Sequence, residues 1–72
     1  MPREELSALL VLLEGDCTQS ELAVRIGRDL RATERSVARL SKQGYATVSV
    51  GRVHLTDAGV LQARRMQPPN AR

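Results

Sequence analysis

The chain has 72 residues, enough for one domain with a small core, and its 11 basic and 8 acidic residues give a net charge of +3. A single cysteine and a single histidine exclude an internal disulfide and a cysteine- or histidine-based metal site, and Tyr45 is the sole aromatic residue. No apolar run reaches the ~20 residues of a membrane span, and no signal-peptide pattern is visible, so we expect a reduced cytoplasmic protein without a membrane partner.

The charge is distributed unevenly along the chain. Residues 1–24 contain one basic and five acidic residues, whereas residues 25–72 contain ten basic and three acidic ones. This polarity is typical of a protein that presents one face to nucleic acid.

Residues 3–14 predict the first helix, with Glu4 and Glu5 at the positive end of its dipole. Its apolar stripe consists of four leucines: Leu6, Leu9, Leu10 and Leu13. Val11 and Leu12 widen this stripe, which indicates either deeper burial or a dimer surface.

A short second helix follows a glycine stop. Gly15 is the expected C-terminal cap of the first helix, and Cys17 occupies a short extended link as a buried structural thiol. Thr18 and Glu21 form a capping box that opens the second helix, which Gly27 ends. Three residues of this helix are expected to point inward: Leu22, Ala23 and Ile26.

The stretch 27–44 predicts a helix with one apolar and one basic side. At about 100° per residue, the apolar stripe contains Leu30, Thr33, Val37 and Leu40. The opposite side, within roughly 80°, contains five basic residues: Arg28, Arg31, Arg35, Arg39 and Lys42. Either Asp29 or Thr33 can cap this helix. A capped short helix, a glycine turn and a second amphipathic helix make a helix-turn-helix.

Residues 45–55 change from helical to alternating periodicity and predict a hairpin. Gly51 and Arg52 are the expected type II′ turn, which places Arg52 at the tip. His54 is expected to be an exposed strand residue, with a phosphate contact as the alternative. The side chains expected to face inward are Val48, Val50, Val53 and Leu55.

A closing helix follows the hairpin, with Thr56 as its cap and Asp57 in its first turn. Its expected core-facing side chains are Val60, Leu61 and Met66. We therefore expect one domain over residues 1–66 and a disordered tail over residues 67–72.

The order of these elements resembles a winged helix-turn-helix, a mostly α fold with a small β-hairpin. Residues 18–23, TQSELA, followed by Ile26 and Gly27, resemble the second helix of MarR-type regulators. Residues 39–45, RLSKQGY, resemble the end of their recognition helix, and residues 55–59, LTDAG, resemble the segment after their wing. The long terminal helices that form the dimer and ligand pocket in MarR proteins are missing, so the resemblance implies their DNA-binding module.

The resulting functional prediction is a small sequence-specific double-stranded DNA-binding protein, most simply a transcriptional regulator, that inserts the 29–43 helix into the major groove. A homodimer through the first helix, the last helix or both would extend the site it reads. The predicted DNA-binding residues are Thr18, Gln19, Ser20, Arg28, Arg31, Arg35, Arg39, Lys42 and Arg52.

Other functions are less well supported by the residues. A winged helix can also be a protein-docking module without specific DNA binding, and the acidic first third could hold a basic partner. RNA binding lacks the interleaved aromatic residues that stack on bases. No catalytic set, metal-ligand spacing or phosphate-binding glycine loop is present, so neither an enzyme nor a cofactor is expected.

Overall fold

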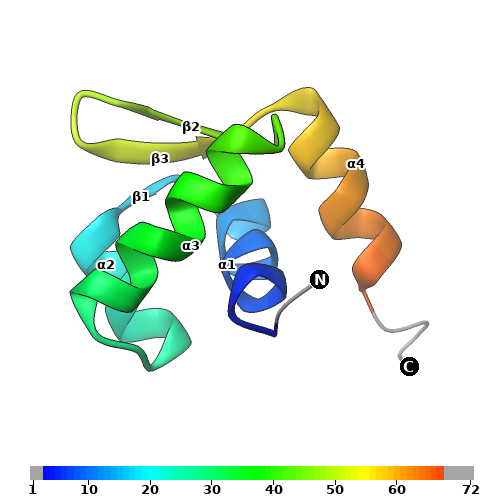
Figure 1. The fold of residues 1–72 in the computed structure, drawn as a ribbon. Coiled ribbons are helices and arrows are strands. Elements are labelled where there is room, and N and C mark those ends of the chain that lie inside the picture. Colours follow the sequence, from blue (N-terminus) through cyan, green and yellow to red (C-terminus); the bar gives the residue numbers. More distant parts are fainter. Residues whose placement is uncertain (1–2, 68–72) are drawn as a thin grey trace.

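The computed structural model describes residues 3–67, and it contains helices and strands in the predicted order (Figure 1). The predicted tail, apart from Gln67, lies outside the described residues. The mostly α fold with a hairpin, the winged helix-turn-helix, is confirmed. The elements are α1 (Arg3–Glu14), β1 (Cys17–Thr18), α2 (Gln19–Ile26), α3 (Leu30–Lys42), β2 (Ala46–Ser49), β3 (Arg52–Leu55) and α4 (Asp57–Met66).

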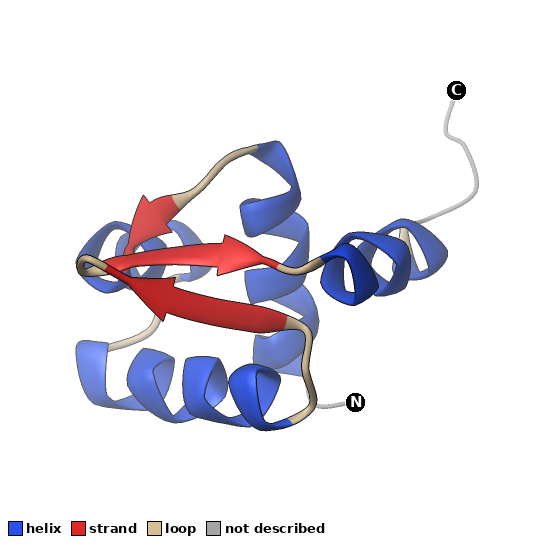
Figure 2. Ribbon diagram, turned by 90° about the horizontal axis from the view of Figure 1, so that it is seen from above, coloured by secondary structure: helices blue, strands red, loops and turns tan. Residues whose placement is uncertain are grey.

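The hairpin belongs to a three-stranded antiparallel sheet with the order β1-β3-β2, rather than standing alone (Figure 2). The extended link that contains Cys17 is itself a strand, and Cys17 pairs with Val53 of β3. The link therefore fastens the wing to the start of α2.

The core lies between the four helices α1, α2, α3 and α4 and the inner face of the sheet. Its buried members are Ala8, Leu9, Leu12, Cys17, Leu22, Val37, Leu40, Ala46, Val53 and Ala63. The prediction of a buried thiol is confirmed, and burial raises the pKa of Cys17, with a further contribution from the charge of Glu21.

The predicted stripe of α1 is partly wrong. Leu9 is fully buried, but the other buried positions are Glu5, Ala8 and Leu12, while Leu6, Leu10 and Leu13 are half-buried. Because α1 contacts α2 and α3 as well as α4, its buried face is centred on Glu5, Ala8, Leu9 and Leu12 and not on the predicted stripe of leucines. Gly15 ends α1 by donating its N–H to the Leu12 carbonyl at 3.1 Å, without the left-handed backbone of a glycine cap.

The predicted turn of the hairpin is wrong by one residue. Ser49 pairs with Arg52, so the turn residues are Val50 and Gly51, with φ values of 52° and 74°. Two positive φ values make a type I′ turn, whose twist matches that of the flanking strands. Val50 is consequently 96% exposed at the tip instead of facing inward, and Arg52 begins β3 instead of occupying the tip.

The cap of α4 is confirmed, but its predicted core face is not. Thr56 accepts a hydrogen bond from the N–H of Gly59 at 3.0 Å, and its hydroxyl donates to the Gly44 carbonyl at 2.6 Å. The buried residues of α4 are Gly59 and Ala63, because the helix packs closely through small side chains. Val60 is half-buried, whereas Leu61 and Met66 are exposed.

Candidate nucleic-acid interface

The helix-turn-helix begins with the predicted capping box. The N–H of Thr18 donates to Glu21 Oε1 at 2.9 Å, and the N–H of Glu21 donates to Thr18 Oγ1 at 3.1 Å. The hydrogen bonds from Thr18 hold the pKa of Glu21 below its usual range. At the other end of α2, Gly27 adopts a left-handed φ of 71°, which turns the chain toward α3.

Asp29 is the cap of α3, which decides between the two predicted caps. Its carboxylate accepts from the N–H of Ala32 at 2.7 Å. Thr33 lies inside the helix, fully buried, and its hydroxyl donates to the Asp29 carbonyl at 2.9 Å. The buried threonine is thus satisfied by the backbone of the cap.

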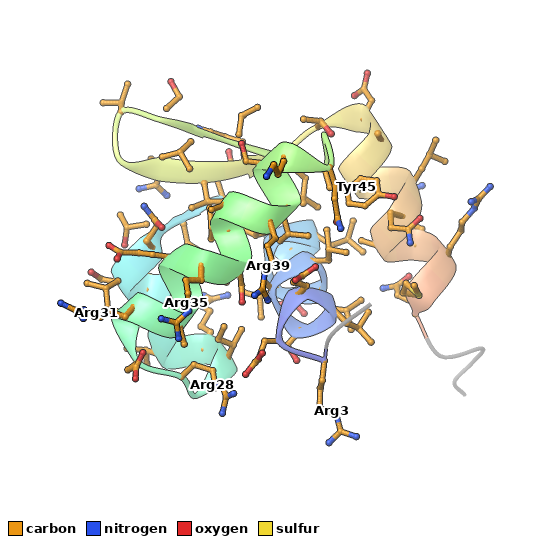
Figure 3. All side chains as sticks on the ribbon, viewed as in Figure 1. Arg3, Arg28, Arg31, Arg35, Arg39 and Tyr45 are labelled. Carbon is orange, nitrogen blue, oxygen red and sulfur yellow. The ribbon has the colours of Figure 1, made fainter. Side chains whose placement is uncertain are left out.

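The core side of α3 consists of Thr33, Ser36, Val37 and Leu40. Leu30, predicted to join them, is 44% exposed because it is the first residue of the helix. At about 100° per residue, the direction opposite the core side is shared by Arg31, Arg35 and Lys42, which fall within roughly 40° of each other. All three are exposed, and Figure 3 shows Arg31 and Arg35 directed away from the core.

Arg28 and Arg39 lie on the flank of this basic face, and both form ion pairs with α1. Arg28 pairs with Glu4 beside a pocket of about 440 Å³ between the start of α1 and the turn. Arg39 Nη1 lies 3.5 Å from Glu5 Oε2, and Figure 3 shows Arg39 between α3 and α1. The predicted basic face of five residues therefore divides into three residues that point outward and two, Arg28 and Arg39, that form ion pairs with α1.

Sequence reasoning missed the role of the two glutamates, which it assigned only to the helix dipole. Glu5 is 1% exposed. A signal for this burial was present, since Glu5 precedes Leu9 by four residues and Leu12 by seven, and these spacings place all three on one face of a helix.

The remaining predicted DNA-binding residues lie at the start of α2 and on the wing. Thr18 and Gln19 are half-buried and Ser20 is exposed. Arg52 Nη2 donates to the Asp16 carbonyl at 3.1 Å, which ties the end of β3 next to the turn to the loop before β1.

His54 supports the same connection. Its Nδ1 lies 2.7 Å from Asp16 Oδ2, and its side chain is 35% exposed. His54 is a strand residue as predicted, but it is half-buried instead of exposed, because the loop before β1 packs against β3.

Comparison with known proteins identifies the architecture. No protein-family model and no curated protein matches the chain. A MarR family protein of Mycobacterium tuberculosis superimposes with a TM-score of 0.85 at 21% identity, over 90% of this chain and 50% of that one. A MarR/EmrR family transcriptional regulator of Acinetobacter gives a TM-score of 0.82 at 24% identity, over 90% and 49%. The chain has a MarR-like winged-helix fold.

This MarR-like winged helix spans about half the length of those two proteins. A candidate DNA-binding protein of Ralstonia eutropha matches over a comparable length, with 28% identity and a TM-score of 0.80, over 94% of this chain and 99% of that one. Within residues 3–67, no helix has the length and apolar character needed to cross a bilayer. The same residues contain no cluster of three or more His, Cys, Asp or Glu side chains suited to a metal ion.

Proposed function

We propose that residues 1–66 bind double-stranded DNA sequence-specifically as a transcriptional regulator, with α3 in the major groove. The observation that carries this proposal is the outward cluster of Arg31, Arg35 and Lys42 on the side of α3 opposite the core. A helix in the major groove reads bases mainly from its first turns, where Arg31 and Arg35 lie. Their guanidinium groups suit guanine O6 and N7, and Lys42 suits a phosphate.

Backbone contacts complete the proposed complex. The start of α2 offers free N–H groups together with Gln19 and the exposed Ser20, and Thr18 keeps its hydroxyl hydrogen while its oxygen caps the helix. Arg52 reaches the minor groove or its flanking phosphates from beside the turn of the wing after leaving the Asp16 carbonyl. These contacts set the register of α3 on the duplex.

The assembly is proposed to be a cytoplasmic homodimer through α1, α4 or both, because one small module covers few base pairs. Leu61 of α4 is 65% exposed, and Leu10 and Leu13 of α1 are half-buried, so both helices retain apolar surface. The MarR family protein of M. tuberculosis, the transcriptional regulator of Acinetobacter and the R. eutropha protein of matching length support a regulatory DNA-binding role.

The test is a fluorescence-anisotropy titration with duplexes selected from a random pool and with the DNA upstream of the protein's own gene. Arg31→Ala/Arg35→Ala should weaken binding by at least about tenfold, since each bidentate base contact contributes about 1–3 kcal/mol. Arg64→Ala/Arg65→Ala on α4 removes the same charge from exposed positions and is the matched control.

Affinity should also fall steeply between 50 and 200 mM salt. The proposal fails if the wild-type protein binds no duplex, if its binding is nearly independent of salt, or if the α3 and α4 double variants bind equally well.

A further inference from the structure

The first turn of α1 contains an unusual buried acid. Glu5 is 1% exposed, and neither of its carboxylate oxygens has a hydrogen-bond partner in the part of the chain that the structure describes. Removing a carboxylate from water is costly unless a counter-charge accompanies it. The counter-charge here is Arg39, whose Nη1 lies 3.5 Å from Glu5 Oε2.

This pairing determines where the Arg39 guanidinium lies. Arg39 is about 60–80° from Arg31 and Lys42 around the axis of α3, on the flank that faces α1. Arg28, at the turn before α3, also pairs with α1, through Glu4, whose side chain is 32% exposed. Both acids belong to one turn of α1, and each pairs with a cation of the basic stretch. The paired side chains are still 50% (Arg28) and 58% (Arg39) exposed.

A carboxylate and a phosphate compete for the same guanidinium donors. For Arg39 to bind a phosphate fully, it would have to leave Glu5, and the Glu5 carboxylate would then be buried without a counter-charge. An exposed arginine without such a partner carries no comparable penalty. The two kinds of arginine on this surface should therefore behave differently toward DNA.

We infer that Glu5, with Glu4 beside it, is a positioning residue that holds Arg39 and Arg28 against α1 and keeps them out of the phosphate-contacting set. This inference rests on the proposed DNA binding and refines it: Arg31, Arg35 and Lys42 make the ionic contacts of α3. The acid pair thereby limits both the affinity for a polyanion and its dependence on salt.

The inference is tested by a double-variant cycle of Glu5→Gln and Arg39→Ala, using one duplex and anisotropy titrations from 50 to 300 mM salt. Glutamine keeps the volume of Glu5 and removes its charge. In Glu5→Gln we expect Arg39 to gain one phosphate, which raises affinity about five- to tenfold at 0.1 M salt and steepens the slope of log K against log salt by about 0.9. The Glu5→Gln/Arg39→Ala variant should return to the wild-type affinity and slope.

Glu14→Gln is the matched charge control, because Glu14 is exposed at the opposite end of α1. It should change affinity by less than about twofold. Arg39→Ala in the wild-type background should also leave the affinity for DNA nearly unchanged. If Arg39→Ala unfolds because Glu5 loses its counter-charge, Glu5→Gln/Arg39→Ala tests the loss of Arg39 without a buried charge at position 5.

The outcomes separate the two proposals. If Arg39→Ala, or Glu5→Gln/Arg39→Ala, binds the duplex clearly more weakly than the wild-type protein, then Arg39 is a phosphate contact in the wild-type protein. The inference is then overturned while DNA binding stands. If Glu5→Gln changes only the melting temperature and leaves the salt slope unchanged, Glu5 is merely structural and the inference is again overturned. If no variant and no wild-type protein binds a duplex, the proposed function itself fails.

Discussion

Replacing Gly59 by alanine tests how α4 is seated on the rest of the domain. A Cβ at this position would overlap the carbonyl oxygen of Tyr45, lie 2.9 Å from its carbonyl carbon and lie 3.2 Å from Leu55 Cδ2. Tyr45 cannot easily retreat, because its N–H donates to Leu40 at 2.9 Å and its carbonyl accepts from the N–H of Thr56 at 3.0 Å.

Two effects of opposite sign compete in this variant. Alanine is the better helix former by up to about 1 kcal/mol. Forcing a methyl group into a closed site costs about 1–3 kcal/mol, and loss of the bond between Thr56 and Tyr45 costs about 1 kcal/mol more. We therefore expect a net loss of about 2 kcal/mol in the free energy of unfolding, and a fall in melting temperature of about 8–16 °C for a domain of this size.

Urea and thermal unfolding followed by circular dichroism measure this difference. Gly15→Ala is the control, because a Cβ there meets nothing within 4 Å, and it should change stability by less than about 0.5 kcal/mol. A Gly59→Ala protein as stable as the wild type, or more stable, would refute the close approach of α4 to Tyr45.

Three further outcomes follow from described contacts. Val50→Asn should stabilise the protein by about 1 kcal/mol in urea unfolding, because valine at φ 52° is strained in a turn that favours Asn-Gly; a lower midpoint would contradict the turn type. The folded state lowers the pKa of Glu21, so the stabilisation by its ionised carboxylate is present above the ordinary glutamate pKa and is lost as pH falls. The difference in unfolding free energy between wild type and Glu21→Gln should therefore shrink from pH 7 to pH 3. A constant difference would argue against the capping box of Thr18 and Glu21. Burial raises the pKa of the Cys17 thiol, so iodoacetamide at pH 8 should alkylate the folded protein far more slowly than the urea-unfolded one, and equal rates would show that the thiol is accessible.

The features that could be predicted from the sequence are those specified within a few residues. Thr18 and Glu21 are three positions apart and satisfy each other's backbone groups, so their box needs no tertiary context. The same holds for Gly27 at the end of α2 and Thr56 at the start of α4. The element order, and with it the winged-helix architecture, follows from these local signals.

The errors concern positions whose environment comes from distant parts of the chain. Hydrophobicity alone predicts that Leu61 and Met66 are buried. However, α4 approaches α1 and β3 through Gly59 and Ala63, where small residues permit close packing. The predicted turn is off by one residue because glycine can occupy either central position of a two-residue turn. Only the observed pairing of Ser49 with Arg52 decides between the two positions.

The candidate site shows the same division. The outward position of Arg31 and Arg35 follows from helical periodicity and needed no structure. The ion pairs of Arg28 and Arg39 join residues 24 and 34 positions apart along the chain, which no periodicity within α3 can reveal. These ion pairs can be predicted only once the packing of α1 against α3 is known.

The hydrogen bond from the Thr56 hydroxyl to the Gly44 carbonyl joins the two ends of the wing and fixes its base. The turn at the far end of the hairpin, beyond the last strand pair of Ser49 and Arg52, can vary in length without transmitting strain to the ends of α3 and α4. Since doubling a flexible loop costs only about 0.6 kcal/mol, several residues inserted between Val50 and Gly51 should be tolerated. The tip is therefore a natural place to graft a longer basic finger onto an otherwise unchanged domain.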